Sequence, residues 1–296
     1  MSAAEVRLAL AQMALRFDNV EGAERWFESV LSDNDLRALA EAGLGRVAGY
    51  RGDIQAANAR FESAIRLMAW DFTIWMDYAQ YWAQRVANSY DPKERVRHAS
   101  RLIDALENAL TISEATPELN SLMGFAYLAK GNDPHEAIDY LEAAAAEAPH
   151  DQASRLLLAN CYLRLGQREQ AATQLLAAVA LEPGSADLHN NLANVLMARE
   201  DYPAAEELLI RAVGASERVM GEDSLDVAVG LNNLASLYSR RDRQDRAEPL
   251  LELFGAGFGE AAGDHGLLVD GTVRRGDHLV EQAEAIAHAA IRTFGQ

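Results

Sequence analysis

The sequence predicts an all-helical repeat protein, in which about seven similar helix-turn-helix units stack on one another. Three observations support this prediction. Small residues recur at intervals of 34, 34, 45, 35, 34 and 42 residues, alanines follow most of them at a fixed distance, and glycines follow three of them. Periods of this length are typical of stacked repeats, which bury a continuous core only against their neighbours. The recurring small residues are Ala11, Gly45, Ala79, Gly124, Ala159, Ala193 and Ala235.

Each unit also contains a second helical pattern. An alanine stands 12 residues after the small residue in five units, and a bulky apolar residue follows four positions later. Spacings of three and four residues place side chains on one face of a helix, so each unit contains two helices that meet at small side chains. The alanines are Ala23, Ala57, Ala171, Ala205 and Ala247, with Ala137 after 13 residues, and the bulky residues are Phe27, Phe61, Leu141, Leu175, Leu209 and Leu251.

These patterns resemble the tetratricopeptide repeat, a 34-residue helix-turn-helix unit with the pattern W-x2-L-G-x2-Y, then A-x3-F, then P. The fifth unit shows the resemblance well, with Leu158-Ala159, Tyr162, Gly166, Ala171, Leu175, Ala178 and Pro183. The resemblance covers residues 4–254 and implies a right-handed superhelix of α-α solenoid type. The stretch from Gly221 to Tyr238 resembles the 42-residue variant found in kinesin light chains.

Two local signals refine the expected helices. Gly52, Gly131 and Gly166 each follow the small residue by seven positions, where the turn between the two helices should fall, and glycine suits a left-handed cap there. In the third unit, Asp91-Pro92 is typical of a helix start, so we expect a helix from about Pro92 to Ile112 that is longer than its counterparts.

The end of the chain departs from the repeat pattern. We expect repeats over 1–254, a glycine-rich segment over 255–276 with a short hairpin at Asp270-Gly271, and an amphipathic helix over 277–296. A solenoid needs its last apolar face covered, so this helix is interpreted as a cap. Two alternatives are that it folds into the concave groove as an internal ligand or mediates self-association.

Composition excludes several functions. The chain has 45 acidic and 27 basic residues, a formal charge of −18, so it would repel the phosphate backbone of a nucleic acid. The single Cys161 is interpreted as a small packing residue. No apolar stretch is long enough for membrane insertion, and no secretory signal is visible. We therefore expect a cytoplasmic protein, or a periplasmic one if an export signal has been removed.

The sequence predicts a binding protein that is not an enzyme. It contains no metalloprotease, paired-cysteine, phosphate-loop or nucleophile-elbow motif, so no cofactor or metal is expected. The seven histidines are scattered among different expected elements, and we interpret them as solvated surface residues. Catalysis would need a convergent site around His265 and His278 in the tail.

In the resembled family, the first helix of each unit lines the concave face, which holds a partner peptide or helix. By the repeat spacing, the residues predicted to line this face include Ala42, Arg46, Tyr50, Met76, Gln80, Gln84 and Ser121. The predicted groove consists of Phe125, Leu156, Asn160, Arg164, Asn190, Asn191, Asn194, Met197, Asn232, Asn233 and Arg240. An asparagine amide is both donor and acceptor, so a row of them can hold an extended peptide backbone.

The resulting hypothesis is a non-enzymatic scaffold or adaptor for a protein or peptide partner. The runner-up is a regulatory module that controls an enzyme or signalling system on another chain. An alternative reading of the asparagines is that Leu-Asn-Asn-Leu belongs to this repeat variant and that some of them bond within the stack.

Overall fold

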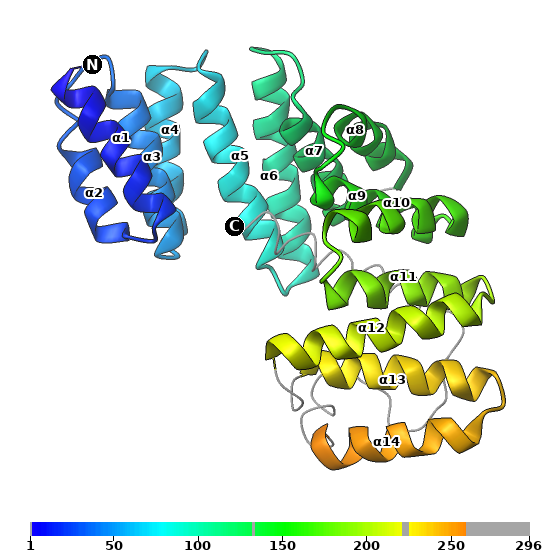
Figure 1. Ribbon diagram of the computed structural model, residues 1–296. Coiled ribbons are helices and arrows are strands. Elements are labelled where there is room, and N and C mark those ends of the chain that lie inside the picture. Colours follow the sequence, from blue (N-terminus) through cyan, green and yellow to red (C-terminus); the bar gives the residue numbers. More distant parts are fainter. Residues whose placement is uncertain (1, 132–133, 221–224, 259–296) are drawn as a thin grey trace. The chain divides into compact units, whose positions relative to one another are not determined.

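The computed structural model describes residues 2–131, 134–220 and 225–258, and these residues form fourteen α-helices with no strand (Figure 1). The helices alternate as the first and second members of seven pairs, as the sequence predicts. The chain divides into two compact units, Met1–Asp133 and Pro134–Gln296. Both are built from the same helical hairpin.

The N-terminal unit has a continuous layer made of the first helix of each pair. Helices that follow one another in sequence pack together, and α1, α3, α5 and α7 also contact each other in turn, whereas α2, α4 and α6 do not contact one another within this unit. The helices are α1 (Ala3–Arg16), α2 (Val20–Glu28), α3 (Arg37–Tyr50), α4 (Ile54–Leu67), α5 (Phe72–Ala87), α6 (Pro92–Leu110) and α7 (Pro117–Ala129).

The C-terminal unit repeats this arrangement with one interruption. Helices α11 and α13 contact each other, but among the described residues α9 and α11 do not, and α10 contacts both of them. The helices are α8 (Pro134–Glu147), α9 (Gln152–Arg164), α10 (Arg168–Leu181), α11 (Ala186–Ala198), α12 (Tyr202–Met220), α13 (Leu225–Arg240) and α14 (Gln244–Phe258).

Polar side chains begin most of these helices. The first N–H groups of a helix have no partner within it, and a side-chain oxygen just before the helix can accept from them. Asp91, predicted as the start of the long sixth helix, accepts from the N–H of Lys93. The same role falls to Ser2, Asn19, Asp53, Asp71, Thr116, Asp151 and Ser185.

The recurring small residues lie where helices approach most closely. Ala11, Ala79, Ala159 and Ala193 are all fully buried. A Cβ atom on Gly45 would lie 2.8 Å from the ring of the buried Phe61, so the space beside α3 is filled by an aromatic side chain of the paired helix α4. In this pair, the bulky residue predicted four positions after the alanine fills the space that the small residue leaves, whereas Leu251 in the last pair is exposed.

The turns inside the pairs share one backbone conformation. A residue with φ between 53° and 79° stands seven positions after the small residue in every pair described except the third. The prediction for Gly52, Gly131 and Gly166 is confirmed. At the same position the other pairs have Asp18, Glu200 and Asp242, which sequence reasoning did not single out.

The predicted long helix is confirmed as α6, which ends at Leu110 after 19 residues. Helix α12 is equally long and takes up residues of the stretched interval between Ala193 and Ala235. Helix α14 continues through Gly255 and Gly257 to Phe258, beyond the expected end of the repeats at 254. Its packing along α13 outweighs a glycine cost of about 1 kcal/mol each. The rest of the expected glycine-rich segment, with its hairpin at Asp270-Gly271, and the expected helix over 277–296 lie outside the described residues.

Replacing Glu200 by glycine is expected to stabilise the protein by about 0.5–1 kcal/mol, because a left-handed backbone costs a residue with a Cβ atom about 1–2 kcal/mol. Gly166→Ala is expected to destabilise it by a similar amount. Urea unfolding followed by circular dichroism measures both changes. A Glu200→Gly variant that unfolds at lower urea than the parent would contradict this reading of the turn.

Gly43→Ala is expected to destabilise the protein by about 1–3 kcal/mol, because the added methyl group would overlap the ring of the buried Phe27. Gly214→Ala is the matched control. Its methyl group would meet its nearest neighbour, Arg218, at an ordinary 3.7 Å, so higher helix propensity should raise stability by up to about 1 kcal/mol. If the two substitutions changed the melting temperature equally, the close contact between α3 and Phe27 at Gly43 would not restrict the size of the residue there.

Candidate functional site

The structure divides the predicted groove between the two units. Phe125 is buried in α7 of the N-terminal unit, and the other ten residues belong to the C-terminal unit. They lie on α9 (Leu156, Asn160 and Arg164), α11 (Asn190, Asn191, Asn194 and Met197) and α13 (Asn232, Asn233 and Arg240). All ten are therefore on the first helices of their pairs, as predicted.

These ten residues lie on three helices, of which two pack directly. Helices α11 and α13 pack against each other, so their asparagines belong to one contiguous pair of helices. Among the described residues, the backbones of α9 and α11 do not approach each other in this way, and Leu156 and Asn160 lie on α9. The candidate site of the C-terminal unit is therefore centred on α11 and α13.

Two asparagines of α11 have a side-chain acceptor that is left unpaired. Oδ1 of Asn190 and Oδ1 of Asn194 are both buried and accept no hydrogen bond from the residues that the structure describes. Asn190 is only 6% exposed, whereas Asn194 is half-buried. A buried acceptor left unpaired costs about 1–3 kcal/mol, and most such groups in folded proteins are paired. The two orphaned acceptors mark this part of α11 as a place where outside donors would be stabilised.

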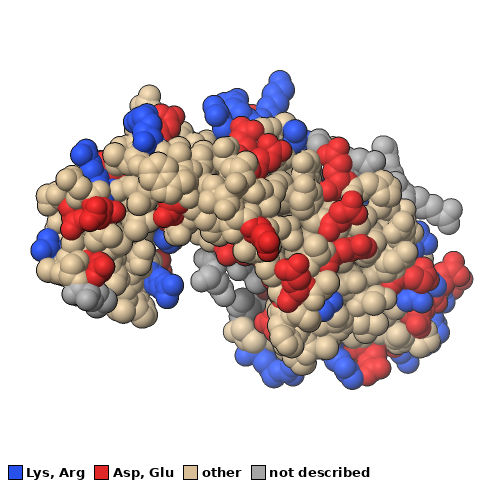
Figure 2. All heavy atoms as spheres, turned by 90° about the horizontal axis from the view of Figure 1, so that it is seen from above, with Lys and Arg blue, Asp and Glu red and all other residues tan. Residues whose placement is uncertain are grey.

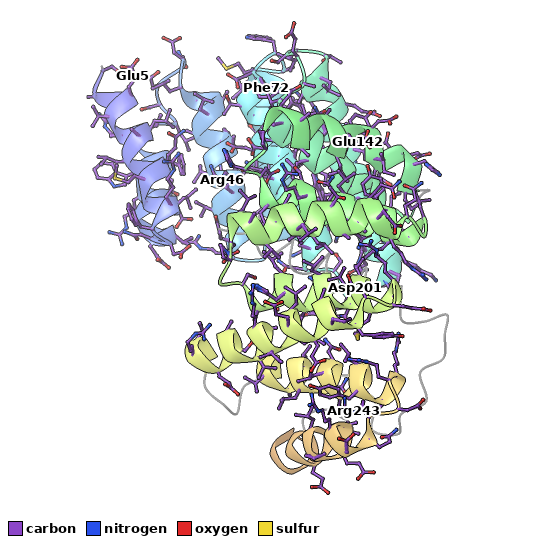
Figure 3. The ribbon with its side chains drawn as sticks, turned by 45° about the vertical axis from the view of Figure 1, so that its right-hand side comes forward. Glu5, Arg46, Phe72, Glu142, Asp201 and Arg243 are labelled. Atoms are coloured by element: carbon purple, nitrogen blue, oxygen red, sulfur yellow. The ribbon has the colours of Figure 1, made fainter. Side chains whose placement is uncertain are left out.

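In the N-terminal unit, the structure shows which side chains of successive first helices face each other. There Arg46 of α3 contacts Asp77 of α5, with Nη1 3.3 Å from Oδ1 (Arg46 is labelled in Figure 3). Arg46 follows its small residue by one position, and Asp77 precedes its own by two. Asn194 and Asn233 occupy the same two positions relative to the small residues of α11 and α13, which pack against each other.

The charge distribution distinguishes the two units. The C-terminal unit holds 26 acidic and 13 basic residues, against 19 and 14 in the N-terminal unit. Figure 2 shows the carboxylates scattered over the face seen from above and interspersed with Lys and Arg. Within the candidate site itself, Arg164 and Arg240 are exposed at the C-terminal ends of α9 and α13. The site is polar and mainly uncharged within an acidic unit.

Tyrosines next to the site are held by carboxylates of second helices. The hydroxyl of Tyr162 donates to Oε1 of Glu142 at 2.6 Å, and that of Tyr238 donates to Oε1 of Glu206 at 2.7 Å. Burial is the main cause that raises the pKa of both phenols, and the carboxylate acceptors add to it. These hydroxyls fix α9 and α13 on their neighbours as neutral donors.

Groups suited to catalysis or metal binding are not gathered in the described part of the chain. No cluster of three or more His, Cys, Asp and Glu residues there could hold a metal ion. None of the described helices is long and apolar enough to cross a bilayer. His98 and His189, both expected at the surface, are instead buried. Nδ1 of His98 lies 2.8 Å from Oγ of Ser89, and burial lowers the pKa of its ring, so it is a neutral packing residue. Nδ1 of His189 lies 2.6 Å from the backbone oxygen of Ser185.

Sequence reasoning missed one polar site on the first-helix layer of the N-terminal unit. Spacing identified Arg46, Tyr50, Gln80 and Gln84 as inward-facing, and the structure adds Asp77 and Tyr81 to them around one small pocket. An arginine and an aspartate 31 residues apart, close to one repeat length, were the available signal. The pocket is lined by α3 and α5 only.

Comparison with known structures places the fold among helical-repeat solenoids. A signal-transduction ATPase with a tetratricopeptide-repeat sensor, PH0952 from Pyrococcus horikoshii, matches 88% of this chain and 43% of its own, with 15% identity and a TM-score of 0.68. The C-terminal part of a repeat protein from Cytophaga hutchinsonii matches 87% of this chain and 98% of its own, with 13% identity and a TM-score of 0.64. YrrB, described as having an unusual peptide-binding site, matches 66% and 94%, with 19% identity and a TM-score of 0.52.

Sequence comparison is more specific. Two models of the tetratricopeptide repeat match residues 128–180 and 184–253. No curated protein sequence matches the chain. These matches show that residues 128–180 and 184–253 contain tetratricopeptide repeats, and the solved structures share the helical-repeat fold of the chain. They do not single out the kinesin light chain variant.

Cys161 is expected to be unreactive in the native protein. Its side chain is fully buried, and burial raises the pKa of the thiol to about 12, so almost no thiolate is present at pH 8. Ellman's reagent should modify it at least about a hundredfold more slowly in the folded protein than in guanidinium chloride. Rapid labelling of the folded protein would indicate a reactive thiol and contradict its interpretation as a packing residue.

Proposed function

We propose that the C-terminal unit binds an extended segment of a partner protein along α11 and α13. Interaction with other proteins is the general role of tetratricopeptide repeats, and the proposal assigns that role to a particular surface. The observation that carries it is the pair of buried, unpartnered acceptors on Asn190 and Asn194. A peptide whose N–H groups reach these atoms would remove the penalty of leaving them unpaired.

The spacing of the two asparagines supports an extended ligand. They are four residues apart in α11, which separates them by about 6 Å along the helix axis. In an extended peptide, N–H groups on the same edge recur every second residue, about 6.6 Å apart. The two acceptors can therefore bond two N–H groups of one extended chain without reading its side chains. Specificity then comes from neighbouring groups, such as Arg240 on α13.

The test uses peptides selected from a random display library on the full-length protein. Asn190→Ala combined with Asn194→Ala is expected to weaken the selected peptides at least about tenfold by isothermal titration calorimetry, because two hydrogen bonds are lost. Stability should stay equal or rise, since the substitutions remove orphaned acceptors. Loss of binding without loss of folding separates a binding role from a structural one.

The matched control is Asn34→Ala, which removes an exposed asparagine from a loop of the N-terminal unit and should leave affinity unchanged. Replacing the N–H groups of a selected peptide one at a time by N-methyl groups supplies a second readout. Two positions separated by one residue should be sensitive. Unchanged affinity in the double variant for every selected peptide would overturn the proposal.

A second candidate function is regulation of an enzyme on another chain. The likeness in fold to PH0952, whose tetratricopeptide-repeat part is described as a sensor of an ATPase, favours it. In that case the same groove would bind a segment of the regulated enzyme. A catalytic rate that changes when the full-length protein is added, and not when the Asn190→Ala and Asn194→Ala variant is added, would distinguish regulation from passive scaffolding.

A further inference from the structure

The first-helix layer of the N-terminal unit contains a small polar pocket that the proposed groove does not use. It lies between α3 and α5 and has a volume of about 30 Å³, close to the space of one water molecule in the liquid. Its lining residues are Arg46, Tyr50, Asp77, Gln80, Tyr81 and Gln84. A group entering it must therefore be compact and polar.

Asp77 is the pocket's one carboxylate, and its charge is incompletely compensated. Its only polar contact among the described residues is the single 3.3 Å approach of Arg46 Nη1 to Oδ1. Burial raises the pKa of Asp77, and this effect exceeds the opposing influence of Arg46. The carboxylates of Asp71 and Glu118 raise it further. A second cation would therefore be stabilised here.

Tyr81 supplies a second and independent sign of a missing partner. Its side chain is only 4% exposed, and its buried hydroxyl has no hydrogen-bond partner in the described part of the chain. The ring is fixed, because a Cβ atom on Gly49 of α3 would lie 2.8 Å from it and the ring of Phe61 lies 5.5 Å away. The hydroxyl thus remains an unsatisfied polar group in a rigid wall.

The amides at the rim favour a donor over an acceptor. Nε2 of Gln80 donates to Oε1 of Glu118 at 2.7 Å, so this amide keeps its carbonyl oxygen for an incoming donor. An incoming carboxylate would have to compete with Asp77 for Arg46 and would face the repulsion of Glu118. The formal charge of the whole chain, −18, adds to that repulsion.

Size decides between the two basic side chains. An ammonium group is a compact point charge of roughly the size of a water molecule, whereas a guanidinium group is a wide planar fork. The phenol rings of Tyr50 and Tyr81 can also attract a cation. A space of about 30 Å³ favours the compact ammonium over the wider guanidinium fork.

We propose that this pocket binds a lysine side chain of the partner, with Asp77 as the counter-ion and the Tyr81 hydroxyl as an additional acceptor. The inference rests on the proposed function in that the partner is a peptide segment, but it concerns a different unit and different residues. It adds a charge preference that the asparagines of α11 cannot provide.

The test measures binding of fluorescein-labelled hexalysine to the full-length protein by fluorescence anisotropy at about 0.15 M salt, where long-range attraction is screened. Asp77→Asn is expected to weaken binding about tenfold. Tyr81→Phe, which changes no charge, is expected to weaken it about threefold and to raise the melting temperature by a few degrees, because it removes an unpaired buried hydroxyl.

The matched control is Asp104→Asn on α6, which removes one exposed carboxylate and should change affinity less than twofold. Labelled hexa-arginine should bind at least about fivefold more weakly than hexalysine. Equal weakening by Asp77→Asn and Asp104→Asn, with no effect of Tyr81→Phe, would show diffuse attraction and overturn the proposal. Because hexalysine is itself an extended peptide, each variant is also compared in the Asn190→Ala and Asn194→Ala background, so failure here is distinguishable from failure of the groove.

Discussion

The close approach of helices at small residues is the constraint on which the rest of the structure depends. Ala11, Ala79, Ala159 and Ala193 are fully buried, and Gly43 and Gly45 lie directly against aromatic rings. Because a larger residue would separate the helices, the repeat can maintain one register only while these positions stay small. That register decides which side chains of successive first helices meet. Arg46 and Asp77 meet in this way, and Asn194 and Asn233 hold the same positions.

Much of the fold follows from local rules that one sequence reveals. The period, the alanines and the Asp91-Pro92 start predict seven helix pairs and a long sixth helix, and the described residues confirm both. Glycine marked the left-handed position in three turns. Glu200 carries no such signal, because its conformation is imposed by the register and not by its own preference. Helix α14 continues through Gly255, which the sequence predicted as a helix breaker, because packing along α13 outweighs the local preference of glycine.

The candidate site was less predictable than the fold. Spacing alone placed the asparagines on the first helices, which the structure confirms. Whether an amide is satisfied depends on every neighbour, so the orphaned acceptors on Asn190 and Asn194 could not be inferred from the sequence. Which helices contact each other could not be inferred from the sequence either. Among the described residues, α9 and α11 have no direct backbone contact, so Asn160 lies apart from the asparagines of α11 and α13. Asp77 was overlooked because only its tertiary partner distinguishes it from a solvated carboxylate.

The proposed binding surface for partners is the first-helix face of the C-terminal unit. Site-specific photo-crosslinking tests it most directly, with benzoyl-phenylalanine placed either at position 236 on α13 or at position 176, an exposed site on the second helix α10. A peptide selected on the full-length protein should crosslink from position 236 and not from position 176. Crosslinking from position 176 alone would place the partner on the second helices and contradict the account.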